Sequence, residues 1–125
     1  MKQIYSLKSD ARHIENVQKA TLETESYGIV SEHGLFGSSE WWDALKSGEI
    51  KIHALEAVIS KVYMSGHNDF PVFKIEAAGN VTSWERKGNI ALYKEGVPVK
   101  IEYVLTKSKY DQKFSPTILN VWVSE

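Results

Sequence analysis

The chain has 125 residues, a formal net charge of −1 and no cysteine, and 42% of its residues are hydrophobic. These values argue against intrinsic disorder and exclude disulfides and cysteine-based metal sites. A chain of this length is typical of one domain, so we predict a single domain over residues 1–125. Residues 1–8 lack the apolar run of a signal peptide and no stretch resembles a membrane span, so we expect a cytoplasmic protein with no membrane association.

The first 49 residues are predicted to form an N-terminal extension of strand and helix. Residues 2–8 have the composition of a short strand, and Ile14 and Val17 lie on one face of a helix predicted over residues 10–19. Residues 20–30 are rich in threonine and other β-formers, which favours an extended segment there.

A second helix is predicted over residues 39–47, and its end signals are the strongest in the chain. A serine precedes it as N-cap, Glu40 lies in its first turn, Lys46 lies in its last turn, and Gly48 follows its end. Trp41 and Leu45 are four residues apart and therefore share a face. We expect this helix to lay at least one indole against a core.

Residues 50–125 contain five stretches in which apolar and polar residues alternate, separated by glycine, asparagine and proline breaks. The first, residues 50–64, is apolar on both faces in its middle, so we expect it to bend or to be covered on both sides. In residues 99–106 Val99, Ile101, Tyr103 and Leu105 alternate with the polar residues Lys100, Glu102 and Thr106, which predicts one buried face. For residues 81–87 the pattern does not decide between the Val81 face and the Trp84 face.

This order of strands resembles the five-stranded barrel of the OB-fold over residues 50–125. The phrase from Lys94 to Tyr103 is similar to the turn and fourth strand of such barrels. Two departures are that Ala57 stands where a glycine is usual and that the first 49 residues have no counterpart. We therefore predict a mainly β protein, a single small OB-like five-stranded barrel with an N-terminal strand and helix extension. An SH3-like barrel and a small open sandwich are the alternatives.

No motif in the sequence predicts catalysis, a cofactor or a metal. The four histidines lack the spacing of a metal site, and the glycines before residue 39 lack the lysine of a nucleotide-binding loop. The turn His67-Asn68-Asp69 offers a general base beside a carboxylate, but asparagine and aspartate in a turn are explained more simply by backbone hydrogen bonding. We therefore predict a binding protein that is not an enzyme. Small-molecule binding or hydrolysis around His67 is the weakest hypothesis.

Negative charge and large aromatic side chains are concentrated in the N-terminal extension. Residues 23–49 hold six acidic residues, Glu23, Glu25, Glu32, Glu40, Asp43 and Glu49, against the single base Lys46. Carboxylates beside aromatic anchors are the combination that recognises a basic protein surface, although a solvated acidic face is the simpler interpretation. The leading hypothesis is protein–protein interaction, with a predicted site at Glu23, Glu25, Glu40, Trp41, Trp42 and Asp43. Small cysteine-free bacterial proteins of this size include inhibitor or immunity proteins that neutralise a cationic nuclease toxin, and the chain is compatible with that class.

The alternative hypothesis is binding of single-stranded nucleic acid on the face that OB-folds use for it. Such sites combine aromatic rings that stack on bases with lysines or arginines that meet phosphates. The matching residues are Phe70, Trp84, Arg86, Lys107, Lys109, Tyr110 and Lys113. Against this hypothesis, so small a barrel needs about half of its rings for its own core. The oligomeric state is left open.

Overall fold

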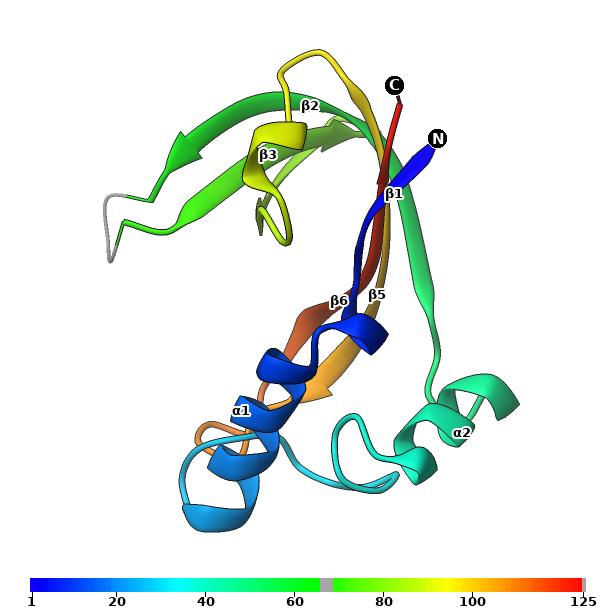
Figure 1. Cartoon of the computed structure of the whole chain (residues 1–125), viewed down its shortest axis with the longest axis vertical. Coiled ribbons are helices and arrows are strands. Elements are labelled where there is room, and N and C mark those ends of the chain that lie inside the picture. Colours follow the sequence, from blue (N-terminus) through cyan, green and yellow to red (C-terminus); the bar gives the residue numbers. More distant parts are fainter. Residues whose placement is uncertain (66–68, 125) are drawn as a thin grey trace. The chain divides into compact units, whose positions relative to one another are not determined.

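The computed structural model describes residues 1–65 and 69–124, and the protein is mainly β, as predicted. Six strands form one sheet in the order β1-β6-β5-β2-β3-β4, together with two α-helices (Figure 1). The strands are β1 (Lys2–Ser6), β2 (His53–Met64), β3 (Pro71–Ala77), β4 (Asn80–Glu85), β5 (Pro98–Lys107) and β6 (Phe114–Val123). The helices are α1 (Ala11–Glu23) and α2 (Ser39–Ser47), with two short 3-10 turns, η1 (Leu7–Ser9) and η2 (Ile90–Leu92).

The sheet is not closed, so the prediction of a five-stranded barrel is wrong in strand number and in closure. The N-terminal strand β1 is the sixth strand, and it pairs antiparallel with β6 from Lys2 opposite Val123 to Ser6 opposite Asn120. Because β6 then has β1 on one side and β5 on the other, it has no free edge with which to close a barrel.

The chain divides into two compact units, which we call the sheet unit and the helix unit. The sheet unit comprises Met1–Ser6, Ala54–Glu102 and Asn120–Glu125, and the helix unit comprises Leu7–His53 and Tyr103–Leu119. Strands β5 and β6 each contribute residues to both units. That the chain behaves as one domain stays a prediction.

In the sheet unit, the core lies between the apolar faces of its strands. The buried hydrophobic residues are Tyr5, Ile59, Val72, Phe73, Ile75, Tyr93, Val99, Ile101, Val121 and Val123. Phe73 on β3 is directly opposite Trp84 on β4, and residues opposite each other in an antiparallel pair lie on the same face. The Trp84 face of β4 is therefore the inner one. The long strand predicted over residues 50–64 begins only at His53, and the pairing of β2 with β3 shifts register between Ile59 and Lys61, an irregularity at which a strand bends.

The helix unit has a core of its own. Its buried hydrophobic residues are Leu7, Phe36, Trp41, Ala44, Leu45, Val104, Ile118 and Leu119. The first helix begins at Ala11, one residue after its predicted start, and Asp10 is its N-cap, with a carboxylate that accepts a hydrogen bond from the His13 backbone N–H at 3.3 Å. The second helix matches its predicted bounds. The Ser38 hydroxyl accepts a hydrogen bond from the Trp41 N–H at 3.3 Å, and Gly48 ends the helix with a left-handed φ of 87°.

The prediction of an extended segment over residues 20–30 is wrong for its first part, because α1 continues to Glu23. The β-branched Thr21 and Thr24 are accommodated because their hydroxyls donate to the carbonyls four residues earlier, each at 2.7 Å. Only the end of the segment is extended: Ile29 forms an isolated antiparallel bridge with Ser108, and the Val30 N–H donates to the Lys107 carbonyl at 2.9 Å.

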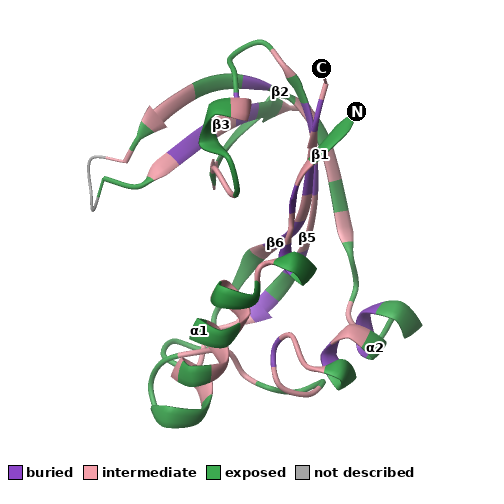
Figure 2. Cartoon of the chain, viewed as in Figure 1, coloured by how far each residue is buried: buried purple, intermediate pink, exposed green. Residues whose placement is uncertain are grey.

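The side of β5 that is buried changes along the strand, which the predicted alternation of Val99, Ile101, Tyr103 and Leu105 does not anticipate. Figure 2 colours the chain by burial, with buried residues in purple. Val99 and Ile101 are buried in the sheet unit, whereas Val104 and Thr106 are buried in the helix unit. Leu105, predicted to share the buried face, is 45% exposed. The physical reason is that β5 supplies side chains to two cores. Odd-numbered residues are buried in the sheet unit and even-numbered residues in the helix unit.

Candidate functional site

Four carboxylates line one open groove in the helix unit, at α2 and the segments on either side of it. This acidic groove, with a volume of about 460 Å³, contains no lysine or arginine among its lining residues. The lining residues are Glu32, His33, Gly34, Glu40, Asp43, Ala44, Ser47 and Glu49. All four carboxylate residues are exposed, so the groove presents their charge to solvent.

Local structure explains why these carboxylates meet. Glu40 and Asp43 are three residues apart on α2 and so lie on one helix face. The loop before the helix comes very close to Glu40 at Gly34, which has a φ of +91°. A Cβ at Gly34 would lie only 2.6 Å from the Glu40 Cβ, so glycine is required there. After the helix, the Ile50 N–H donates to the Ala44 carbonyl at 3.1 Å, which holds the chain next to Glu49 against α2.

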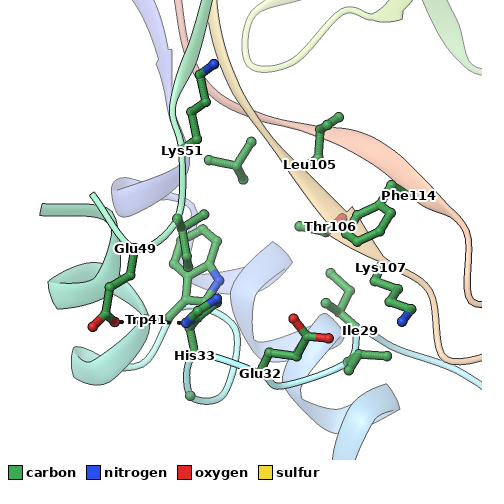
Figure 3. Close-up of a pocket in the computed structure, with 14 residues that line it drawn as sticks. Ile29, Glu32, His33, Trp41, Glu49, Lys51, Leu105, Thr106, Lys107 and Phe114 are labelled. Carbon is green, nitrogen blue, oxygen red and sulfur yellow. Dashed lines mark ion pairs between the residues drawn. The ribbon is translucent and has the colours of Figure 1, made fainter. Parts of the chain in front are cut away.

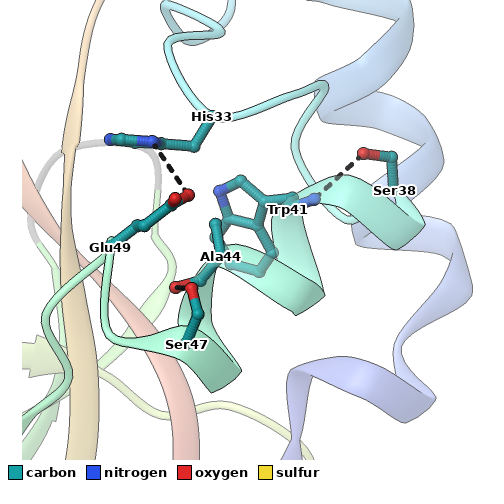
Figure 4. Close-up of polar contacts among 6 residues, drawn as sticks. All are labelled: His33, Ser38, Trp41, Ala44, Ser47 and Glu49. Carbon is teal, nitrogen blue, oxygen red and sulfur yellow. Dashed lines mark hydrogen bonds and ion pairs between the residues drawn. The ribbon is translucent and has the colours of Figure 1, made fainter.

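One ion pair lies at the edge of the acidic groove. His33 Nδ1 is 3.9 Å from Glu49 Oε2, with side chains that are 40% and 66% exposed (Figure 4). At this distance and exposure the pair contributes little to stability, about 0–1 kcal/mol. Glu32, Glu40 and Asp43 make no hydrogen bond or ion pair through their side chains with any residue that the structure describes. Three carboxylates of the groove are therefore available to a partner.

The two adjacent tryptophans of α2 have different environments. Trp41 is only 5% exposed, and its ring centroid lies 4.8 Å from that of Phe36 and 4.9 Å from that of Trp42. Trp42 is half-buried, with the Lys8 ammonium 5.9 Å from its ring centroid. The prediction that α2 lays an indole against a core is confirmed for Trp41. A buried indole serves the core first, so Trp41 cannot act as a freely exposed anchor.

A smaller cavity of about 180 Å³ adjoins Trp41, and we call it the Trp41 pocket (Figure 3). It shares Glu32, His33, Gly34 and Glu49 with the acidic groove. The remaining lining residues are Ile29, Val30, Trp41, Ile50, Lys51, Val104, Leu105, Thr106, Lys107 and Phe114. The lining thus combines apolar and aromatic side chains with charged groups in about equal measure.

The other predicted partner-binding residues do not line the groove. Glu23 is the last residue of α1 and Glu25 lies just after it, both exposed. Nearby, the Lys109 ammonium donates to the carbonyls of Thr21 at 2.7 Å and Thr24 at 2.6 Å. A cation at the C-terminal end of a helix satisfies orphan carbonyls and complements the helix dipole. Lys109 therefore has a structural role.

The residues of the nucleic-acid hypothesis are divided between the two units. Phe70, Trp84 and Arg86 belong to the sheet unit, and Lys107, Lys109, Tyr110 and Lys113 belong to the helix unit. Arg86 donates to the Tyr63 carbonyl at 3.1 Å, and the Lys107 ammonium lies 5.9 Å from the Phe114 ring centroid. Much of this positive charge already has partners within the protein, which weakens the case for phosphate binding. Tyr110 is 75% exposed and Phe70 is 40% exposed.

Two further expectations concern histidines and metals. His67 and Asn68 lie outside the described residues, so the hypothesis of a site at that turn stays a prediction. Asp69, the last residue of the turn, has a left-handed φ of 46°, in keeping with its expected backbone role. Within residues 1–65 and 69–124, no three histidine, aspartate or glutamate side chains are arranged to hold a metal ion.

Sequence reasoning did not assign Glu32, His33 and Glu49 to the site. Their signal was the excess of acidic residues over residues 23–49, which includes both glutamates. The excess gives no indication of which acids converge, because Glu32 and Glu49 lie on opposite sides of α2 in the sequence.

Residues 1–122 match the protein family described as "Immunity protein RhsI2". The chain belongs to this RhsI2 immunity protein family. Membership supports a non-catalytic, inhibitory role in which the chain binds a toxin protein, which confirms the predicted protein–protein interaction at the level of the family. No curated protein sequence matches the chain. Among the described residues of this RhsI2 family member, neither α1 nor α2 is long and apolar enough to span a membrane.

Proposed function

We propose that the chain neutralises a toxin by covering a basic surface of that toxin with its acidic groove. The observation that carries this proposal is the lining of the groove, where four carboxylates are accompanied by no lysine or arginine. Complementary charge accelerates the encounter of two proteins and disfavours partners of the wrong sign. The net charge of the whole chain is only −1, so the attraction comes from this local concentration of charge.

Glu40 and Asp43 are the central residues of the proposed surface, and Glu32 and Glu49 flank them. The side chains of Glu32, Glu40 and Asp43 have no partner among the described residues. They therefore lose only bound water when a cation approaches. Glu23 and Glu25 stay predicted contacts outside the groove. Half-buried Trp42 is the better placed of the two predicted aromatic anchors, since more of its surface is exposed than that of Trp41.

The first experiment identifies the partner. The tagged chain is used to capture proteins from its native lysate after nuclease treatment, and bound proteins are identified by mass spectrometry. We expect one stoichiometric protein with a basic contact surface. Nucleic acid recovered without such a protein would contradict the proposal and favour the alternative hypothesis.

The second experiment locates the surface. The double variant Glu40→Lys and Asp43→Lys is expected to weaken the Kd for the captured toxin by at least about 100-fold, because two attractive contacts become repulsive. The matched control is Glu56→Lys with Glu76→Lys, which changes the net charge equally at two exposed positions of the sheet unit. Equal weakening by both double variants would mean that only overall charge matters, and no weakening by the first would exclude the groove.

A further inference from the structure

We propose that the Trp41 pocket receives a single arginine side chain of the toxin. This inference rests on the proposed function and names the anchor of that interface. Binding energy in protein interfaces is concentrated in a few side chains that fill pockets near the centre, and arginine is one of the residues enriched among them. The pocket adjoins the acidic groove, with which it shares four lining residues, so one partner surface can cover both.

The size of the pocket limits its occupant to one side chain. Its volume is about 180 Å³, whereas an apolar cavity of about 150 Å³ holds one benzene molecule and drug-sized ligands need about 300–1,000 Å³. Phe114 and Leu105 supply the exposed apolar surface of the lining, against which the methylene stem of an arginine can pack, while Trp41 and Val104 are buried behind it. Phe114 and Leu105 are 62% and 45% exposed, so the mouth of the pocket has apolar rims that a partner would desolvate.

The charge available at the pocket is negative. Two lysines are among the lining residues, but in Figure 3 the Lys51 side chain extends away from the open space. The Lys107 ammonium is 5.9 Å from the Phe114 ring centroid and points outward. The Glu32 carboxylate is directed toward the open space and has no partner among the described residues, whereas Glu49 is weakly paired with His33.

An arginine satisfies both features of the pocket together. The methylene stem of an arginine packs against the apolar part of the lining, at which the indole of Trp41 is only 5% exposed, and its planar guanidinium forms bidentate hydrogen bonds with the Glu32 carboxylate. A lysine would match the carboxylate as a point charge but lacks the flat surface. A leucine or phenylalanine would fill the walls but leave Glu32 desolvated and unpaired, which is costly.

A direct test uses N-acetyl-arginine amide as the probe and does not require the toxin. Titration into the ¹⁵N-labelled protein is expected to shift the Trp41 indole N–H resonance, with a Kd on the order of 1 mM, the range for so small a ligand. N-acetyl-leucine amide is the comparison probe. If the leucine probe binds as well as the arginine probe, or if neither shifts the Trp41 resonance, the inference is wrong.

The second test fills the pocket. Leu105→Trp adds an aromatic group at an exposed strand position that lines the pocket, and Val81→Trp makes a similar change at an exposed position of β4 outside it. We expect Leu105→Trp to abolish binding of the arginine probe and to weaken the toxin Kd at least about 30-fold, the loss typical of a central interface residue. Val81→Trp should change neither. Normal binding by Leu105→Trp would overturn the inference.

The charge contribution is tested with Glu32→Gln, which keeps the shape of the side chain, against Glu56→Gln. We expect Glu32→Gln to weaken both the probe and the toxin about tenfold and Glu56→Gln to have no effect. The two proposals fail separately. If the reversal at Glu40 and Asp43 abolishes toxin binding while both pocket variants bind normally, the groove is correct and the pocket inference is wrong. The opposite result would retain the pocket and exclude the groove.

Discussion

Replacing Trp41 with alanine tests whether this indole belongs to the core or to the partner surface. A tryptophan buries about 200 Å², and at about 25 cal/mol per Å² its removal from a site that is 5% exposed should cost about 5 kcal/mol. Measured losses for buried aromatic residues replaced by alanine are about 3–5 kcal/mol. The variant also loses the ring contacts with Phe36 and Trp42. Replacing the half-buried Trp42 with alanine should lower the free energy of unfolding by about half as much.

The free energy of unfolding is measured by urea titration and far-UV circular dichroism, which do not depend on the tryptophans removed. Lys46→Ala, an exposed change on the same helix, is the control and should stay within about 0.5 kcal/mol of the wild type. Because Trp41→Ala removes much of a typical total stability, Trp41→Phe provides a milder variant that keeps a ring against Phe36. A cost below about 1 kcal/mol for Trp41→Ala, together with lost toxin binding, would refute burial of the indole and make it a surface anchor.

Two further predictions concern a glycine contact and a buried phenol. Gly28→Ala should destabilise the protein by at least about 2 kcal/mol more than Gly79→Ala in urea titration, because both have a positive φ but only at Gly28 would the new Cβ lie 2.5 Å from the Thr21 Cα. Similar costs would contradict the close approach. Burial raises the pKa of Tyr93 well above its usual value, while its hydroxyl donates to the Lys87 carbonyl at 2.7 Å. Above pH about 10 the unfolded state binds fewer protons than the folded state, so the free energy of unfolding of the wild type should fall by about 1.4 kcal/mol per pH unit relative to Tyr93→Phe. Parallel stability curves of the two proteins from pH 8 to 11 would exclude this.

Several elements of the fold were predictable because their signals are local. The second helix has a serine N-cap, an acid in its first turn and Gly48 after its end, and these act within four residues of one another. The β3–β4 hairpin follows from alternating residues on either side of a glycine turn. By contrast, the continuation of α1 to Glu23 goes against the strand preference of its threonines, and in the structure the hydroxyls of Thr21 and Thr24 donate to carbonyls one turn earlier.

The candidate site was predicted only in part. Glu40 and Asp43 were predicted because they lie in the acidic stretch of residues 23–49 beside Trp41 and Trp42, and both line the same groove in the structure. The role of Trp41 was the least predictable feature. The spacing of apolar residues along an amphipathic helix is the same whether the indole faces the core or a binding partner. Its 5% exposure depends on Phe36, which comes from the loop before α2.

The sequence by itself determined the mainly β character of the protein, the position of α2, the lack of disulfides and the acid excess over residues 23–49. Each of these depends on composition or on the spacing of residues within one element. Tertiary structure decided that the sheet stays open, that β5 buries odd residues in one unit and even residues in the other, and that Glu32 and Glu49 join Glu40 and Asp43. Spacing fixes which side chains share a face of a helix or strand. Which face is covered, and which distant segments meet there, depends on packing between segments that are far apart in the chain.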